Sequence, residues 1–192
     1  PHIFIGTATC GEAAGALAVL ETIKGELVRR NIQASITRVG CIGLCYAEPL
    51  VDIAKPNRPR ICYGNVTPEI VPLLIEDYII NDNPRPDLAL GTMGEDGVDG
   101  IPRLFDLPML KPQVRIALRN CGHIDPEDIK QYIANDGYSG LVRALEMSPA
   151  TPTIPIEWAS FSTGARSEQM VKVAVMLIPQ PNPVMDLRRT GN

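Results

Sequence analysis

The hydrophobic pattern changes its period twice within the first 39 residues, and this change constrains the fold most. Residues 2–6, HIFIG, form a short apolar run that is typical of a buried strand. The next segment, 7–31, carries apolar side chains at intervals of four, three and four, which places them on one face of a helix: Ala16, Leu20, Ile23 and Leu27. Residues 31–39, NIQASITRV, then alternate apolar and polar side chains, as does a strand with one covered face. The opening is therefore predicted to be strand, helix, strand.

Two further strands and a helix are predicted to follow. The segments PLVDIA (49–54) and RICYGNV (60–66) are joined by KPNRP, whose prolines and asparagine suit a hairpin connection. Residues 67–80 predict a helix with Thr67 as N-cap and Pro68 at the first helical position, although Pro72 would delete an early hydrogen bond. The order βαβββα predicts an α/β fold, with a four-stranded sheet flanked by helices, that ends near residue 81.

The rest of the chain gives weaker signals. Residues 82–112 are rich in Pro, Gly and Asp, show no period and predict an extended linker. Within 113–149 we expect a short strand, QVRIALR, and two helices, PEDIKQYIAN with Asp125 as cap and SGLVRALEM. In residues 150–192 only MVKVAVMLI has the pattern of a strand.

Charge and hydropathy argue against several function classes. The 22 acidic and 18 basic residues are mixed along the chain, so no basic face indicates a nucleic-acid partner. No apolar run approaches the roughly 20 residues of a membrane span, and the first residues lack the features of a signal peptide. We therefore expect a cytoplasmic protein that neither binds nucleic acid nor inserts into a membrane.

The cysteines carry the chemistry. Five cysteines, an odd number, argue against a disulfide framework and for metal or redox use of some of them. Cys41 and Cys45 lie in a glycine-rich loop that can bend both sulfurs toward one metal atom, and Cys10 lies in the first turn of the predicted helix, where the helix dipole favours a thiolate. A thiol-disulfide role for Cys41 and Cys45 is the other reading, and a free cysteine is also often plain packing.

The remaining candidates point to structural roles. Cys62 lies in the middle of a predicted strand and Cys121 beside a turn. Cys121 and His123 form a weak zinc signal without two more ligands. The two histidines, His2 and His123, fall in different segments, so we expect no catalytic triad and no bond chemistry by this chain alone.

Three stretches together resemble a known family: GCIGLCYAEPLVDI (40–53), YGNVTPEIVPLLIEDYI (63–79) and TCGEAAGA (9–16). They are similar to the thioredoxin-like [2Fe-2S] ferredoxin domain, in particular the version at the front of the NADH-binding flavoprotein subunit. That subunit belongs to NAD-linked hydrogenases, formate dehydrogenases and complex I-type NADH dehydrogenases. Residues 113–147 resemble the segment that leads into the flavin domain of the same subunit.

The resemblance implies a [2Fe-2S] cluster with an altered ligand set. Cys10, Cys41 and Cys45 correspond to three family ligands, but the family pattern C-x4-C places the fourth cysteine where this chain has Ile5. We predict Cys62 as the substitute metal ligand, provided that its strand directs it toward the loop. Two weaker candidates are a carboxylate and a hydroxyl, Glu12 and Thr7. Loss of the cluster, with the domain kept for docking, is the other possibility.

The C-terminal segment departs further from the family. The family's flavin domain opens with G-R-G-G-A-G-F-P-T-G, whereas ASFSTGARSE (159–168) matches only its second half. The leading glycines of that motif are missing, and the chain stops at Asn192 before the bulk of a flavin domain. We therefore expect a truncated or degenerate copy that by itself binds neither FMN nor NADH.

The function expected from the sequence is thus an iron-sulfur electron-transfer module of an NADH-oxidising complex, an NADH dehydrogenase or a NAD-linked hydrogenase. Its partners would be the other subunits of that complex. The alternatives are a clusterless docking or assembly module and a thiol-disulfide redox protein.

Overall fold

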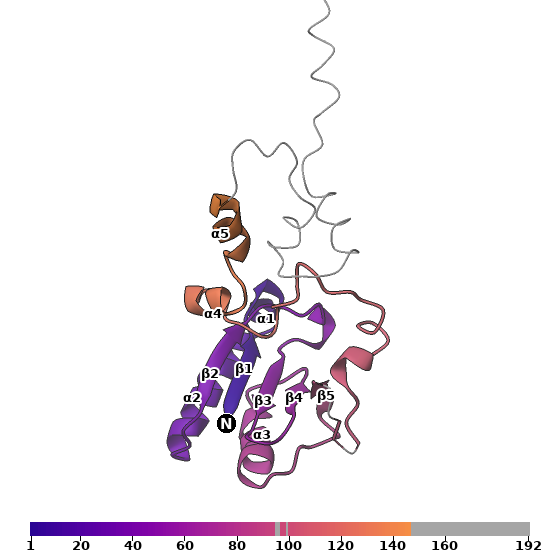
Figure 1. Cartoon of the computed structure of the whole chain (residues 1–192). Helices are drawn as coiled ribbons and strands as arrows, with labels where there is room; N and C mark the ends of the chain where they lie inside the picture. The colour runs from indigo at the N-terminus through magenta and orange to yellow at the C-terminus, as the bar shows by residue number, and fades with distance from the viewer. Residues whose placement is uncertain (95–96, 99, 147–192) are drawn as a thin grey trace, which may run out of the picture. The chain divides into compact units, whose positions relative to one another are not determined.

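The computed structural model describes residues 1–94, 97–98 and 100–146 (Figure 1). These residues belong to two compact units, one over Pro1–Gln131 and one that begins at Tyr132. The flavin-domain remnant predicted at 150–192 lies outside the described residues. Among the described helices, none is long and apolar enough to cross a membrane.

A mixed sheet of five strands forms the centre of the first unit (Figure 1). Its strands, in the spatial order β2-β1-β3-β4-β5, are β1 (His2–Gly6), β2 (Ser35–Val39), β3 (Val51–Ala54), β4 (Arg60–Tyr63) and β5 (Ala89–Met93). β1 runs parallel to β2 and antiparallel to β3, and the β3–β4 and β4–β5 pairs are antiparallel. This combination of a strand-helix-strand unit with a hairpin confirms the predicted α/β, thioredoxin-like class, with five strands where four were predicted.

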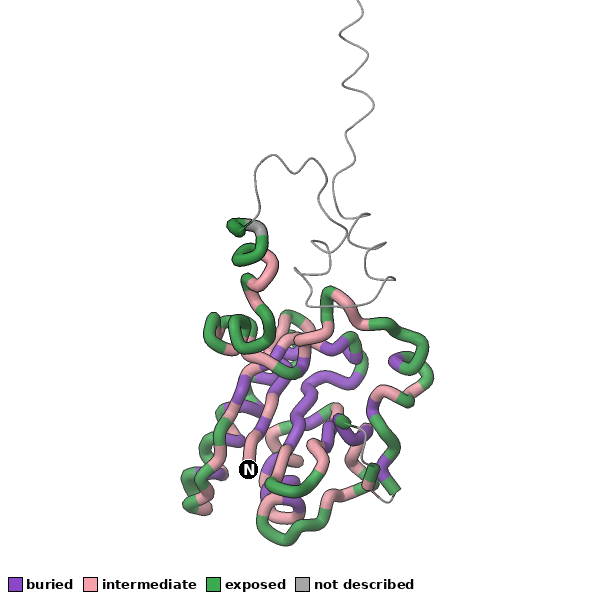
Figure 2. Tube along the Cα trace, viewed as in Figure 1, coloured by how far each residue is buried: buried purple, intermediate pink, exposed green. Residues whose placement is uncertain are grey.

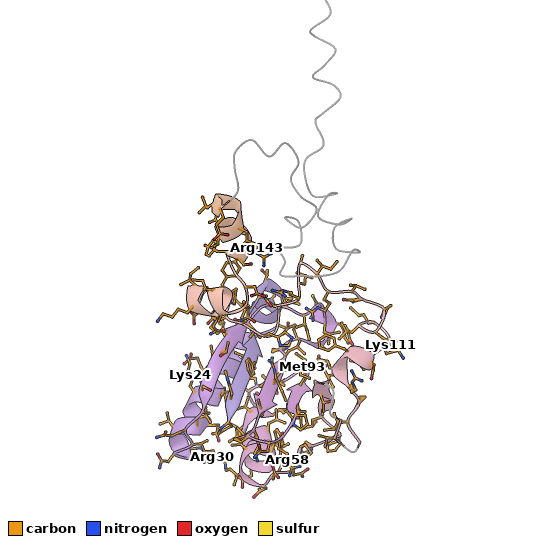
Figure 3. The ribbon with its side chains drawn as sticks, viewed as in Figure 1. Lys24, Arg30, Arg58, Met93, Lys111 and Arg143 are labelled. Carbon is orange, nitrogen blue, oxygen red and sulfur yellow. The ribbon has the colours of Figure 1, made fainter. Side chains whose placement is uncertain are left out.

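The helix predicted after the first strand is divided in two. α1 (Thr9–Ala13) and α2 (Ala16–Arg29) are separated by a break at Gly15, whose φ of 100° lies in the left-handed region that favours glycine. All four apolar positions predicted to share a face of α2 are buried, and Val19 joins them. The charged side chains of α2 lie on its other side, among them the labelled Lys24 (Figure 3).

The helix after the hairpin begins later than predicted. Residues 68–70 form turns, and α3 (Val71–Leu74) continues into the π-helical segment η2 (Ile75–Ile80). Because α3 begins at Val71, Pro72 falls in its first turn, where a missing N–H costs no intrahelical hydrogen bond. The late start therefore removes the conflict that Pro72 posed for the predicted helix.

The two faces of the sheet are covered by different kinds of structure, and Figure 2 shows the buried residues along the central strands. On one face, α2, α3 and η2 pack on side chains of β1, β3 and β4: Ile3, Ile5, Val51, Ile53, Ile61 and Tyr63. On the other face, loops cover a second apolar cluster: Ile42, Leu44, Ala47, Leu50, Cys62, Met93, Leu104 and Leu110. The loop that carries Cys41 and Cys45 is therefore part of the core on this second face.

The segment 82–112 is not the extended linker that its composition predicted. β5 extends the sheet beside β4, and the short helix η3 (Leu104–Asp106) places Leu104 in the second apolar cluster with no exposed surface. Gly91 of β5 permits this contact, because a Cβ there would lie 2.7 Å from the Leu104 Cα. A close approach of two backbones thus explains why a glycine stands within a strand.

The prediction for 113–119 was wrong, and the next helix starts late. Residues 113–119 form coil and turns instead of a strand. Asp125 does not cap a helix directly: its Oδ1 accepts a hydrogen bond from the Glu127 N–H, and α4 (Ile129–Ala134) follows. In the second unit, α5 (Ser139–Glu146) matches the predicted helix SGLVRALEM.

Candidate metal centre

The three cysteines with family counterparts follow strands that end at the same edge of the sheet. Since β1 and β2 are parallel neighbours, the segments after Gly6 and Val39 emerge side by side. Two backbone hydrogen bonds hold them there: Thr7 N–H donates to Val39 O at 3.1 Å, and Gly6 N–H donates to Leu50 O at 3.0 Å. The topology therefore brings α1 and the loop 40–50 together.

The sulfur atoms of Cys10, Cys41 and Cys45 all lie within 4.8 Å of one another. The Cys41 and Cys45 sulfurs are 3.6 Å apart. Two thiolates on one tetrahedral metal lie about 3.8 Å apart when each metal-sulfur distance is about 2.3 Å. The spacing of Cys41 and Cys45 therefore fits a pair of ligands to one metal atom.

The loop that carries Cys41 and Cys45 is held in place by buried apolar residues that alternate with the cysteines. Ile42 and Leu44 are buried in the second apolar cluster, whereas Cys41 is half-buried and Cys45 is exposed. Gly43 lies between them with a φ of 96°, and its N–H donates to the Cys41 sulfur at 3.2 Å. The loop is thus anchored by its apolar side chains and turns its sulfurs outward.

Without a bound cation, the surroundings of Cys41 and Cys10 favour the neutral thiol over the thiolate. Burial raises the pKa of Cys41 to about 12, although the Gly43 N–H opposes this shift, and the nearby Cys10 and Cys45 thiols add to it. Burial also raises the pKa of Cys10, so the thiolate expected there from the helix dipole is not favoured. Thiolates gathered this closely repel one another, so a bound metal ion would stabilise them.

A carboxylate that sequence reasoning missed adjoins the three sulfurs. Glu48 is only 6% exposed, and its Oε1 lies 3.8 Å from the Cys10 sulfur, which donates to it. Its Oε2 accepts a hydrogen bond from the Leu50 N–H at 2.8 Å. Burial raises the pKa of this carboxyl, and within the described residues no cation forms a salt bridge with it. The only sequence signal was an acidic residue close after the glycine-cysteine loop.

Cys62 and Ile5, the two positions that bear on the fourth ligand, lie away from this group. Cys62 faces the loop side of the sheet, but it has no exposed surface and packs in the second apolar cluster. Ile5 is fully buried on the helix-covered face. Cys62 as a ligand therefore stays a prediction that requires the loop above it to rearrange.

The other polar candidates are engaged elsewhere. Arg38 donates to Thr7 Oγ1 at 3.1 Å and to Glu12 Oε1 at 3.5 Å. Cys121 is half-buried, and its sulfur lies 3.6 Å from where a Cβ on Gly40 would be. None of these residues belongs to the group of three sulfurs.

The two histidines also lie outside the group of three sulfurs. His2 stacks on Phe4, and its Nε2 lies 2.7 Å from Thr37 Oγ1. His123 is exposed, and neither histidine belongs to the metal-ligand group that the described residues form.

Comparison with known proteins finds similarity to hydrogenase subunits. The NADP-reducing hydrogenase subunit HndC of Solidesulfovibrio fructosivorans is 62% identical over 40 residues, which make up 21% of this chain and 8% of that subunit. The NADP-reducing hydrogenase subunit HndB of the same organism is 28% identical over 83 residues, 43% of this chain and 66% of that subunit. The chain thus spans less than two thirds of either relative. No protein-family model matches it.

Solved structures of one thioredoxin-like [2Fe-2S] ferredoxin, from Aquifex aeolicus, overlap with part of the chain. One is 20% identical, has a TM-score of 0.42, and covers 50% of this chain and 96% of its own. A wild-type structure of the same ferredoxin is 21% identical, has a TM-score of 0.39, and covers 47% of this chain and 95% of its own.

Proposed function

We propose that this chain is an electron-transfer module that holds a [2Fe-2S] cluster through Cys10, Cys41 and Cys45 and belongs to an NAD(P)-linked hydrogenase or NADH dehydrogenase complex. The observation that carries the proposal is the approach of the three sulfurs to within 4.8 Å of one another. Thiolate sulfur is the usual donor to iron-sulfur clusters, so these three donors fit the group. When bound, such a cluster takes up and gives back one electron at a time.

The chain's own residues would set the environment of that cluster. Cys41 and Cys45 would hold one iron, because one anchored loop presents both sulfurs. The Gly43 N–H, already directed at the Cys41 sulfur, would withdraw charge from it and so tune the potential. The exposed Cys45 places one edge of the site at the surface, where a partner's redox centre can approach.

The names of the relatives support the type of complex. Two subunits described as parts of an NADP-reducing hydrogenase align with parts of this chain. We infer that its partners are other subunits of such a complex, to or from which it passes electrons.

The test is reconstitution of the full chain with iron and sulfide under anaerobic conditions, followed by analysis of both elements and a visible spectrum. We expect about two irons and two sulfides per chain and absorbance beyond the protein band. Cys41→Ser should lose most of the iron, whereas Cys121→Ser, outside the sulfur group, should retain it. A colourless wild-type protein with five titratable thiols would instead indicate the docking module.

A thiol-disulfide function is the second candidate, favoured by the 3.6 Å between the Cys41 and Cys45 sulfurs. Closing a disulfide there would transfer two electrons and two protons to a partner disulfide, which becomes a dithiol. A midpoint potential that requires two electrons, in protein free of iron, would support it. If the thiols of Cys41 and Cys45 stay reduced in an oxidising glutathione buffer, this second candidate is excluded.

A further inference from the structure

The proposed cluster needs four protein ligands, two on each iron, and the described cysteines gather only three sulfurs at the site. Cys41 and Cys45 form one close pair, at 3.6 Å. Cys10 therefore needs a partner of its own. Besides the two other sulfurs, its sulfur has Glu48 Oε1 as a neighbour, at 3.8 Å.

The spacing of Cys10 and Glu48 suits two ligands of one metal atom. A carboxylate oxygen binds a tetrahedral ion such as zinc at about 2.0 to 2.2 Å, which puts it about 3.6 Å from a sulfur on the same ion. The observed 3.8 Å is close to that separation. The site thus contains two donor pairs of similar spacing, one sulfur-sulfur and one sulfur-oxygen.

The surroundings of Glu48 hold the carboxylate in this position. Two glycines leave it room: a Cβ on Gly6 would lie 2.9 Å from Oε2, and one on Gly11 would lie 3.2 Å from the same atom. The Leu50 N–H holds Oε2, which leaves Oε1 on the side of Cys10. A buried carboxylate that has no cationic partner among the described residues is costly, and a metal ion would offset that cost.

We propose that Glu48 supplies the fourth ligand of the metal centre, through a carboxylate oxygen that binds the same metal atom as Cys10. This assignment rests on the proposed cluster and names a residue that completes it. With Glu48 as a ligand, the site needs no cysteine at position 5. The Ile5 side chain packs on the face of the sheet opposite to the loop that carries Cys41 and Cys45. Glu12 is a poorer candidate because it is held by Arg38, and Cys62 is poorer because it is covered by the loop.

Two substitutions at Glu48 test the proposal on the full reconstituted chain. Glu48→Gln keeps the size and an acceptor for the Leu50 N–H but removes the anionic ligand, so iron affinity should fall roughly tenfold or more. Glu48→Cys supplies a fourth thiolate, so iron and sulfide content should stay at the wild-type level. Its visible spectrum should gain thiolate-to-iron absorbance, and its reduced EPR signal should shift. Glu12→Gln, a carboxylate change two residues after Cys10, should leave all of these readings unchanged.

The results separate this proposal from the proposed function. Wild-type iron content, spectrum and EPR signal in both Glu48 variants would overturn the ligand assignment and leave the [2Fe-2S] module intact. The same holds if Cys62→Ser loses the cluster and Glu48→Gln keeps it. Binding of a single metal ion without sulfide, lost in Glu48→Gln, would support the ligand and overturn the [2Fe-2S] function. A wild-type chain that takes up no metal would overturn both, and circular dichroism of each metal-free variant checks that it folds.

Discussion

The Glu48 carboxylate occupies the space beside Gly6 that a side chain at residue 6 would need. The last residue of β1 has no side chain, and a Cβ there would lie 2.9 Å from Oε2 and 3.1 Å from Oε1 of Glu48. At 2.9 Å the carboxylate would have to shift, and 3.1 Å is tighter than most Cβ contacts, so glycine at residue 6 leaves the carboxylate in its observed place. The proposed ligand therefore depends on a residue that binds nothing itself.

Gly6→Ala should displace the Glu48 carboxylate and weaken metal uptake. We expect the iron content after reconstitution to fall as it does in Glu48→Gln, because the oxygen moves away from the Cys10 sulfur. The matched control is Gly25→Ala, on the exposed side of α2, where a new Cβ meets no atom within 4 Å. That change should leave iron unchanged and raise the free energy of unfolding by about 0.5 to 1 kcal/mol. Full iron content in Gly6→Ala would contradict the prediction.

Leu44→Ala should loosen the loop that presents Cys41 and Cys45. Leu44 has no exposed surface and lies between the two cysteines in sequence. Loss of a buried leucine side chain costs about 2 to 5 kcal/mol, measurable by urea unfolding of the metal-free protein. Tyr46→Ala is the control, because its side chain is 66% exposed and its loss should change stability by about 0.5 kcal/mol or less. Equal stability of the two variants would show that the loop is not anchored through Leu44.

The parts of the fold that the sequence predicted well are those with strong local periodicity. β1 and the buried face of α2 were predicted because the spacing of apolar residues within each short segment is enough to indicate them. β5 was missed because Gly91 and its Pro-rich surroundings are unlike a strand, and only pairing with β4 and contact with Leu104 explain it. The 113–119 segment shows the converse: its apolar residues alternate as in a strand, but among the described residues no strand pairs with it.

The residues of the candidate site also differ in whether the sequence could predict them. The pairing of Cys41 with Cys45 could be predicted because both sit in one short loop. Cys10 was singled out by its position at the start of the predicted helix and by the family resemblance. Glu48 could not be predicted, because its relation to Cys10 depends on the hydrogen bond to Leu50 and on the space left by two glycines. Those are properties of the folded backbone, which no residue pattern records.

Arg60→Leu should destabilise the fold strongly. Arg60 Nε donates to Asp52 Oδ2 at 2.8 Å, both side chains are nearly buried, and the guanidinium lies 3.5 Å from the centre of the Phe4 ring. Removal of one partner leaves the Asp52 carboxylate buried without its counter-ion, a change that typically costs about 3 to 5 kcal/mol. Urea unfolding measures this loss. Lys24→Ala, which breaks an exposed pair with Glu21, should cost about 1 kcal/mol or less.

The stability of the metal-free protein should fall at high pH, and Cys41 should be one source of that fall. Its pKa of about 12 in the folded chain exceeds the roughly 8.5 of a free thiol, so the folded state holds this proton more tightly than the unfolded state. The resulting stability is fully present below about pH 8.5 and is lost as the pH rises toward 12. Burial also raises the pKa of Cys10, which acts in the same direction.

The measurement is urea unfolding of wild-type protein and Cys41→Ser at pH 8 and at pH 10.5, with metal removed by a chelator. Tyrosines and lysines titrate in both proteins, so their contribution cancels in the comparison. We expect wild-type protein to lose more stability between the two pH values than Cys41→Ser does, because serine has no proton to release in this range. An equal loss in both would mean that the Cys41 thiol is as free to ionise in the folded chain as in the unfolded one. In that case the sulfur group would not hold the proton that an incoming metal ion must displace.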